Sequence, residues 1–261
     1  FRRAMKLKCF LIIITFLVYF VVMLVIGFYF YKKTTSIEDY LLGGRKMGSW
    51  VTAFSAQASD MSGWLLMGLP GALYLSGMNQ SWIAIGLAIG TYLNWKLVAP
   101  RLRVYTEKTS SLTLPDFFGA RFKDPSGLLR TLSAIIILIF FTIYSSSGLV
   151  AAGKLFESLF SIDYRIAVIV GAVVMIAYTF LGGFLAVCWT DLIQGALMII
   201  AIVIVPVVAF FSVGGFDAIG AAAAARNISF NLFRDSSGFI SIIAIISTMA
   251  WGLGYFGQPH I

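Results

Sequence analysis

Residues 56–63 read AQASDMSG and interrupt an otherwise apolar segment that runs from about residue 50 to residue 75. A carboxylate, two hydroxyls, a glutamine and a glycine therefore lie where a membrane-spanning helix normally offers only hydrocarbon. An ionised carboxylate at bilayer depth costs a few kcal/mol, so it normally faces a cavity, a partner or an ion. Asp60 is therefore the first candidate for a functional residue, with a structural, hydrogen-bonded carboxylate as the alternative.

The same stretch predicts a broken helix. Ser and Asp side chains compete for backbone hydrogen bonds, and glycine loosens the chain. Unwound backbone inside a membrane is tolerated only where it is buried in protein or lines a wet cavity, and many secondary transporters build their ion and substrate sites from such backbone.

The composition indicates an integral membrane protein. The 261 residues are 60% hydrophobic and 11% charged, whereas soluble domains carry about 25% charged residues. The net charge of +8 comes from basic residues in the short segments between apolar runs. Positive-inside topology and anionic headgroups explain this distribution better than nucleic-acid binding does. We therefore expect contact with a lipid bilayer and no nucleic-acid partner.

The apolar runs predict an all-α, polytopic fold with about seven membrane-spanning helices. The expected spans are residues 10–31, 50–75, 81–99, 128–149, 165–187, 192–213 and 239–256. A tight break at Trp189-Thr190-Asp191 is expected to separate the fifth span from the sixth.

The connections between the spans give the expected orientation. Residues 32–49 predict a polar loop that Gly43-Gly44 keeps from being helical, and residues 100–130 predict a longer loop with a short interfacial helix near residues 115–121. Both loops are rich in Lys and Arg, so we expect them in the cytoplasm. An alanine run at residues 221–225 favours a short helix.

Four other features stand out from the residues alone, and two of them have more than one interpretation. Asp191, in the expected tight break, is either a functional acid or a helix cap at the membrane interface. Residues 251–259 read WGLGYFGQP and predict a second interrupted helix, in which Trp251 and Tyr255 either anchor at the headgroups or face a substrate. Arg45 alone is typical of a topology charge, and Gly86-x-x-x-Gly90 predicts close approach of another backbone.

Several blocks, in the same order along the whole chain, resemble the sodium:solute symporter family. They are GGR at residues 43–45, ASDMSGW at 58–64, SWIAIGL at 81–87, the segment 182–191 from GGF to WTD, and WGLGYFGQP at 251–259. The resemblance implies the LeuT-type fold, in which five plus five helices form inverted repeats.

On that fold the resemblance divides a single transporter domain, residues 1–261, into three parts. Residues 10–31 form an extra amino-terminal helix, residues 50–213 the first inverted repeat, and residues 239–261 the first helix of the second repeat. Because the sequence opens with Phe1 and stops at Ile261, we expect it to be an incomplete, amino-terminal fragment.

The resemblance also implies roles for single residues in sodium use. The backbone carbonyls of Ala58 and Met61 would coordinate sodium, and Asp60 and Ser62 would be needed for tight sodium use. The further positions implied in sodium handling and coupling are Asp191 and Arg45.

Trp251, Tyr255 and Pro259 match family positions that shape the proline site. The chemistry is compatible with these roles, because sodium is a hard cation that favours oxygen ligands and broken helices expose carbonyls and hydroxyls.

The function expected from the resemblance is sodium-coupled symport of L-proline across the inner (plasma) membrane by alternating access, with sodium as the co-transported ion. No nucleophile and base pair, phosphate loop or metal cluster stands out in the sequence, so we do not expect an enzyme. Two alternatives remain open: a sodium-coupled symporter for another small solute, and a transporter-like membrane input domain of a sensor.

Overall fold

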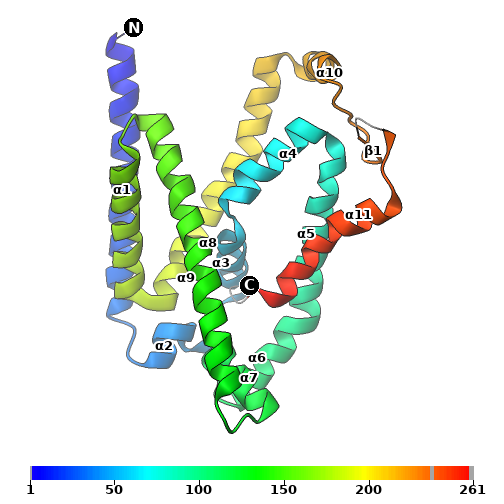
Figure 1. The fold of residues 1–261 in the computed structure, drawn as a ribbon. Coiled ribbons are helices and arrows are strands. Elements are labelled where there is room, and N and C mark those ends of the chain that lie inside the picture. Colours follow the sequence, from blue (N-terminus) through cyan, green and yellow to red (C-terminus); the bar gives the residue numbers. More distant parts are fainter. Residues whose placement is uncertain (1, 236–237, 259–261) are drawn as a thin grey trace. The chain divides into compact units, whose positions relative to one another are not determined.

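The computed structural model describes residues 2–235 and 238–258, and the side chains of residues 14–65, 67–235 and 238–258. Its helices are α1 (Arg2–Tyr31), α2 (Ile37–Leu42), α3 (Ser49–Asp60), α4 (Leu69–Ser76), α5 (Ser81–Leu93), α6 (Ala99–Lys108), α7 (Leu114–Phe122), α8 (Leu128–Phe160), α9 (Tyr164–Val213), α10 (Gly215–Ala225) and α11 (Ile242–Met249) (Figure 1). Shorter helical segments are η1 (Gly43–Arg45), η2 (Trp64–Gly68), η3 (Met78–Gln80), η4 (Asn94–Val98) and η5 (Ala250–Gly257). Two short strands, β1 (Arg234–Asp235) and β2 (Gly238–Phe239), pair antiparallel.

Four described segments are long and apolar enough to cross a membrane: Ile14–Tyr31, Met78–Lys108, Leu128–Phe160 and Tyr164–Val213. The last of these, α9, has 50 residues and a contour length of about 75 Å, more than twice the thickness of a bilayer core. It is therefore long enough for two passes, one on each side of Gly183. The protein is a multi-pass membrane protein with an all-α fold.

The first predicted break is confirmed. α3 ends at Asp60, and the π-helical segment η2 begins at Trp64, with Met61 and Ser62 outside any regular helix. The backbone N–H of Ser62 donates to the carbonyl oxygen of Asp60 at 2.7 Å, a tight local bond that helical backbone does not make. The chain is therefore unwound beside the carboxylate.

The second predicted interruption is confirmed as a change of helix type. α11 ends at Met249, and the chain continues as the 3₁₀ helix η5. A 3₁₀ helix has poorer hydrogen-bond geometry than an α-helix and is rarely so long. Gly252, Gly254 and Gly257 lie within it, and glycine weakens α-helical propensity.

The break expected at residues 189–191 is wrong. These residues are helical, and the chain instead leaves helical geometry at Gly183, whose φ is 61° and ψ is −155°. A Cβ at Gly183 would lie 2.7 Å from Cδ2 of Tyr40, so both its left-handed backbone and its close packing require glycine. The hydroxyl of Thr190 donates to the carbonyl of Val187 at 2.8 Å, which satisfies this polar side chain inside the helix.

Two loop predictions also need correction. Residues 99–108, expected to be loop, form α6, because Pro100 occupies the first turn after η4, where its missing N–H costs little. The backbone N–H of Ala99 donates to Asn94 across η4, so helical bonding continues through the proline. The expected loop at residues 32–49 contains α2. The short helices expected near residues 115–121 and 221–225 are confirmed as α7 and part of α10.

The chain forms two compact units. The first comprises Phe1–Ser59 and Leu132–Ala196, and the second comprises Asp60–Thr131 and Leu197–Ile261. In the first unit α1 packs against the end of α8 through Phe16, whose ring centroid lies 5.1 Å from that of Phe156. α1 also meets α9, because a Cβ at Gly27 would lie 3.1 Å from Tyr178.

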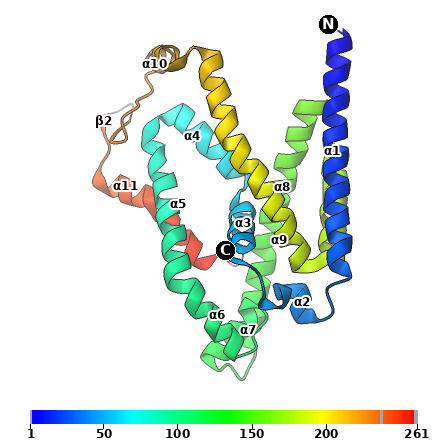
Figure 2. The same cartoon turned by 180° about the vertical axis from the view of Figure 1, so that it is seen from behind.

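In the second unit α5 lies beside α11 and η5, as both views show (Figure 1 and Figure 2). A Cβ on Gly86 would lie 2.6 Å from Cα of Met249, and one on Gly90 would lie 2.8 Å from Cα of Gly252. Only glycine permits such an approach, so the predicted role of Gly86-x-x-x-Gly90 is confirmed. The backbone that approaches it belongs to the second interrupted helix.

Candidate ion and substrate site

The residues after the first break and the second interrupted helix meet in the second unit. The hydroxyl of Tyr255 donates a hydrogen bond to Oδ2 of Asp60. Tyr255 is only 4% exposed, so its hydroxyl needs a partner, and the carboxylate provides one. The structure thus joins a residue expected to shape the substrate site to one expected to act on sodium.

A second contact joins the same two segments. The indole rings of Trp64 and Trp251 are stacked, with centroids 4.4 Å apart and an angle of 27° between their planes. Trp64 follows Asp60 by four residues, and Trp251 precedes Tyr255 by four, so the two segments run antiparallel with one contact at each end. Trp251 remains 51% exposed, so the described residues do not cover all of its side chain.

Two more predicted ion-site residues lie at the first break. Met61 and Ser62 are outside regular helix, where backbone carbonyls are not committed to helical bonds. The hydroxyl of Ser62 accepts a hydrogen bond from the backbone N–H of Leu65 at 3.4 Å. Carbonyl and hydroxyl oxygens freed in this way are the ligands that unwound transporter helices offer to a hard cation.

Asp191 occupies a different environment from the one expected. It lies inside α9, is 8% exposed, and accepts a hydrogen bond from the Ser55 hydroxyl at 2.7 Å and a longer one from the Ser59 hydroxyl at 3.4 Å. The interpretation of Asp191 as a cap in an interfacial turn is therefore wrong. A buried carboxylate requires such hydrogen bonds or an ion to offset its desolvation.

The end of α3 in the first unit is fixed by α8 and α9. The hydroxyl of Tyr144, on α8, donates to the carbonyl oxygen of Ser59 at 3.0 Å. Ala58 lies against Gly195 of α9, where an added Cβ would be 3.8 Å from the Cβ of Ala58. Ala58 and Asp191 thus belong to the first unit, whereas Asp60, Met61 and Ser62 belong to the second.

Arg45 lies at the end of η1, in the connection between α2 and α3. Its φ is 57°, and its Nε lies 3.1 Å from Oε1 of Glu38, with the Arg45 side chain 12% exposed. Arg45 therefore forms an ion pair with Glu38 of α2. Pro259, the remaining predicted site residue, lies outside the described residues.

The sequence interpretation missed two residues that contact predicted ones, Ser55 and Trp64. It also missed two residues one contact further away: Tyr144, which bonds to Ser59, and Cys188, which lies beside Ser55. The Oγ of Ser55 also lies 3.4 Å from the sulfur of buried Cys188. The spacing of Ser55 and Ser59 could have indicated Ser55, because side chains four residues apart share one face of a helix. For Tyr144 and Trp64 the contacts are with distant segments, which spacing does not reveal.

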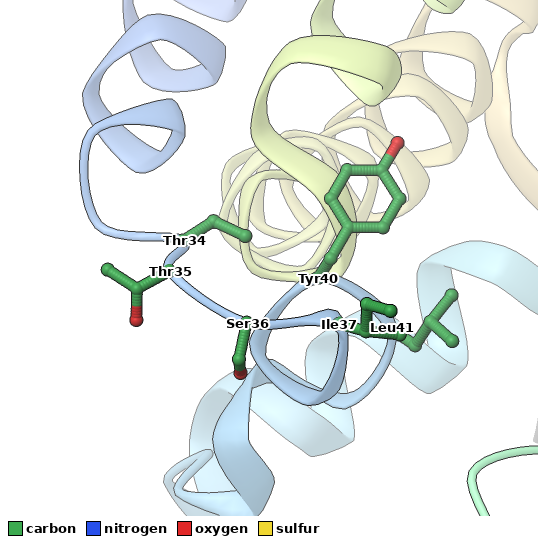
Figure 3. Close-up of a pocket in the computed structure, with 6 residues that line it drawn as sticks. All are labelled: Thr34, Thr35, Ser36, Ile37, Tyr40 and Leu41. Atoms are coloured by element: carbon green, nitrogen blue, oxygen red, sulfur yellow. The ribbon is translucent and has the colours of Figure 1, made fainter.

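A shallow depression lies away from these residues. It has a volume of about 380 Å³ and is lined by Thr34, Thr35, Ser36, Ile37, Tyr40 and Leu41, all from the α1–α2 connection and α2 (Figure 3). Here the Thr35 hydroxyl donates to Asp39 at 2.9 Å, and this hydrogen bond lowers the pKa of the Asp39 carboxyl. The depression contains none of the predicted site residues. Its hydroxyl groups belong to the residues just before α2, which hydrogen-bond to the start of that helix.

Comparison with known proteins identifies the family to which the chain belongs. The sequence pattern of the sodium:solute symporter family matches residues 40–261. The chain belongs to the sodium:solute symporter family, and the resemblance noted in the sequence is confirmed.

Among individual relatives, the sodium/proline symporter of Escherichia coli is 55% identical over 251 residues, which cover 95% of this chain and 49% of the relative. The osmoregulated proline transporter of Bacillus subtilis is 52% identical over 252 residues, covering 96% of this chain and 50% of the relative. The chain thus spans about half the length of the curated relatives it matches.

A solved structure gives the fold. A sodium-coupled sialic acid symporter, in a substrate-bound outward-open state, matches with a TM-score of 0.72 at 21% identity. The match covers 91% of this chain and 49% of the symporter.

Proposed function

We propose that the protein carries L-proline together with sodium across the bacterial plasma membrane by alternating access. Sodium is a co-transported substrate, and no covalent chemistry takes part. The observation that carries the proposal is the hydrogen bond from Tyr255 to Asp60. It joins a residue of the second interrupted helix to the carboxylate at the first break, and this contact supports a shared site for substrate and ion.

In this function the first break supplies the sodium ligands. The backbone carbonyls of Ala58 and Met61 bind the ion, and Asp60 and Ser62 strengthen its binding. Sodium favours the outward-open state and raises the affinity for proline by a coupling free energy of about 1 to 3 kcal/mol.

Two other residues proposed for ion coupling, Asp191 and Arg45, lie outside the first break. Asp191 contributes a buried carboxylate to sodium handling, supported by its burial among the hydroxyls of Ser55 and Ser59. Arg45 acts on coupling from the connection before α3.

The second interrupted helix supplies the substrate residues, which are Trp251, Tyr255 and Pro259. Proline is a small zwitterion with an apolar ring, so a half-exposed indole and a tyrosine offer it apolar contact. In the corresponding repeat arrangement, residues 10–31 are an extra helix, residues 50–213 the first inverted repeat and residues 239–261 the start of the second.

Uptake of labelled proline tests the proposal. Vesicles bearing the gene's whole reading frame receive an inward sodium gradient or an equal potassium gradient. Sodium-dependent accumulation, blocked by excess unlabelled proline, is the expected result. Accumulation of proline with potassium alone would contradict sodium coupling, and sodium-dependent competition by another amino acid, sugar or vitamin but not by proline would contradict the cargo.

Substitution in the second interrupted helix tests the substrate residues. Trp251→Ala and Tyr255→Ala should raise the KM for proline, because the first removes an indole from the site and the second removes the hydrogen bond to Asp60. An effect confined to the amount of protein in the membrane would instead support a role in interfacial anchoring.

A further inference from the structure

Trp64 has no role in the proposed function so far, yet its indole makes a close ring contact with Trp251. The rings are stacked at 4.4 Å and 27°. Stacked aromatic pairs gain stability beyond the area they bury, and they restrict each other's orientation. Trp251 is 51% exposed among the described residues, and Trp64 covers one face of its indole.

Trp64 is itself held in place by a glycine. A Cβ at Gly68 would lie 2.8 Å from Cδ1 of Trp64 and 3.0 Å from Nε1. The indole therefore lies flat over the next turn of its own helix, in the space that any other residue at position 68 would fill. Residues 64 to 68 form the π-helical segment η2, a type of irregularity that is frequent at functional sites.

The backbone of Trp251 is held by α5. Gly86 and Gly90 contact Met249 and Gly252, on either side of Trp251. Four residues of α-helix and three residues of 3₁₀ helix both rise about 6 Å. The 3₁₀ geometry of η5 therefore lets its backbone contact both glycines of α5. This contact holds the backbone of Trp251, and the stack with Trp64 holds its indole ring.

We propose that Trp64 is a positioning residue of the substrate site: it holds the indole of Trp251 so that its free face meets the apolar ring of the substrate. This assignment rests on the proposed function. The substrate class it selects is a small cyclic amino acid, whose compact, rigid ring packs on an indole face better than a flexible linear side chain does. Loss of Trp64 leaves Trp251 present but free to rotate away.

Three variants test the assignment in the whole reading frame, reconstituted in proteoliposomes. Trp64→Ala removes the stack, Trp64→Phe restores a ring, and Gly68→Ala keeps the indole but displaces it. Trp50→Ala is the matched control, because Trp50 lies on α3 and is 77% exposed. The measurements are the KM and kcat of proline uptake at saturating sodium, the sodium concentration for half-maximal uptake, and competition by azetidine-2-carboxylate, pipecolate and alanine.

Trp64→Ala and Gly68→Ala should raise the KM for proline about three- to tenfold, as expected for loss of one aromatic contact. The kcat and the sodium requirement should stay near the wild-type values, and the preference for cyclic over linear competitors should fall. Trp64→Phe should recover most of the affinity, and Trp50→Ala should change none of these quantities. A purely structural role would lower kcat or the amount of protein and leave the competitor ranking intact.

Circular dichroism of the purified protein gives a readout independent of transport. Two stacked indoles produce an exciton couplet, which should be present in the wild type and in Trp50→Ala, absent in Trp64→Ala and reduced in Gly68→Ala. Loss of the couplet with unchanged KM and competitor ranking would overturn the assignment while leaving the proposed function intact. Failure of the wild type to take up proline would overturn the proposed function, and the assignment with it.

Discussion

At the scale of single residues, Asp60 accepts a hydrogen bond from the hydroxyl of Tyr255 in the second unit. An asparagine at position 60 would keep an oxygen that accepts this hydrogen bond but would remove the negative charge. The substitution therefore separates the electrostatic role of Asp60 from its structural one.

Asp60→Asn should raise the sodium concentration needed for half-maximal proline uptake by orders of magnitude, because the ion loses a nearby negative charge. The KM for proline at saturating sodium should change much less. Asp217→Asn, on the first turn of α10, is the control and should have no effect. An unchanged sodium dependence in Asp60→Asn would contradict the role proposed for this carboxylate.

At the scale of elements, the contact between α5 and the α11–η5 helix depends on backbone meeting backbone at Gly86, Gly90 and Gly252. No side chain can move aside to accept a methyl group there. The contact is therefore more sensitive to an added Cβ than one between flexible side chains.

Gly90→Ala should lower the unfolding free energy by about 1 to 3 kcal/mol, the usual cost of overpacking a close contact, and should displace η5. Thermal unfolding in detergent measures the loss. Gly171→Ala, in α9 where an added Cβ meets nothing within 4 Å, is the matched control. Equal stability of Gly90→Ala and Gly171→Ala would show that the close approach does not constrain the second interrupted helix.

At the scale of the whole molecule, the distribution of Lys and Arg predicts orientation. The connection before α3 and the α6–α7 region carry most of the basic residues between spans, so both should face the cytoplasm. Connections on the other side, after α8 and around α10, carry few.

Cysteine labelling in intact cells tests this orientation. Lys123→Cys, after α7, should react with a membrane-impermeant maleimide only after the cells are opened, because its loop lies inside. Ser161→Cys, after α8, should react in intact cells. Both variants are made in a background that lacks the native cysteines, and the reverse pattern would contradict the orientation.

The local chemistry of the chain was sufficient to predict the class of fold and the two interrupted helices. Hydropathy predicts helical spans because backbone polar groups must be satisfied inside the bilayer. Ser, Asp and Gly indicated the break after Asp60, and the glycines of residues 251–257 indicated the change at Met249, because helix weakness is a property of neighbouring residues.

Contacts between distant segments are properties of the tertiary fold alone. The chain bends at Gly183, beside Tyr40, rather than at residues 189–191, and Asp191 is a buried carboxylate that accepts a hydrogen bond from Ser55. The stacking of Trp64 on Trp251 likewise joins segments nearly two hundred residues apart. Spacing along one helix shows which residues share a face, but the partner of that face is chosen by how the helices pack.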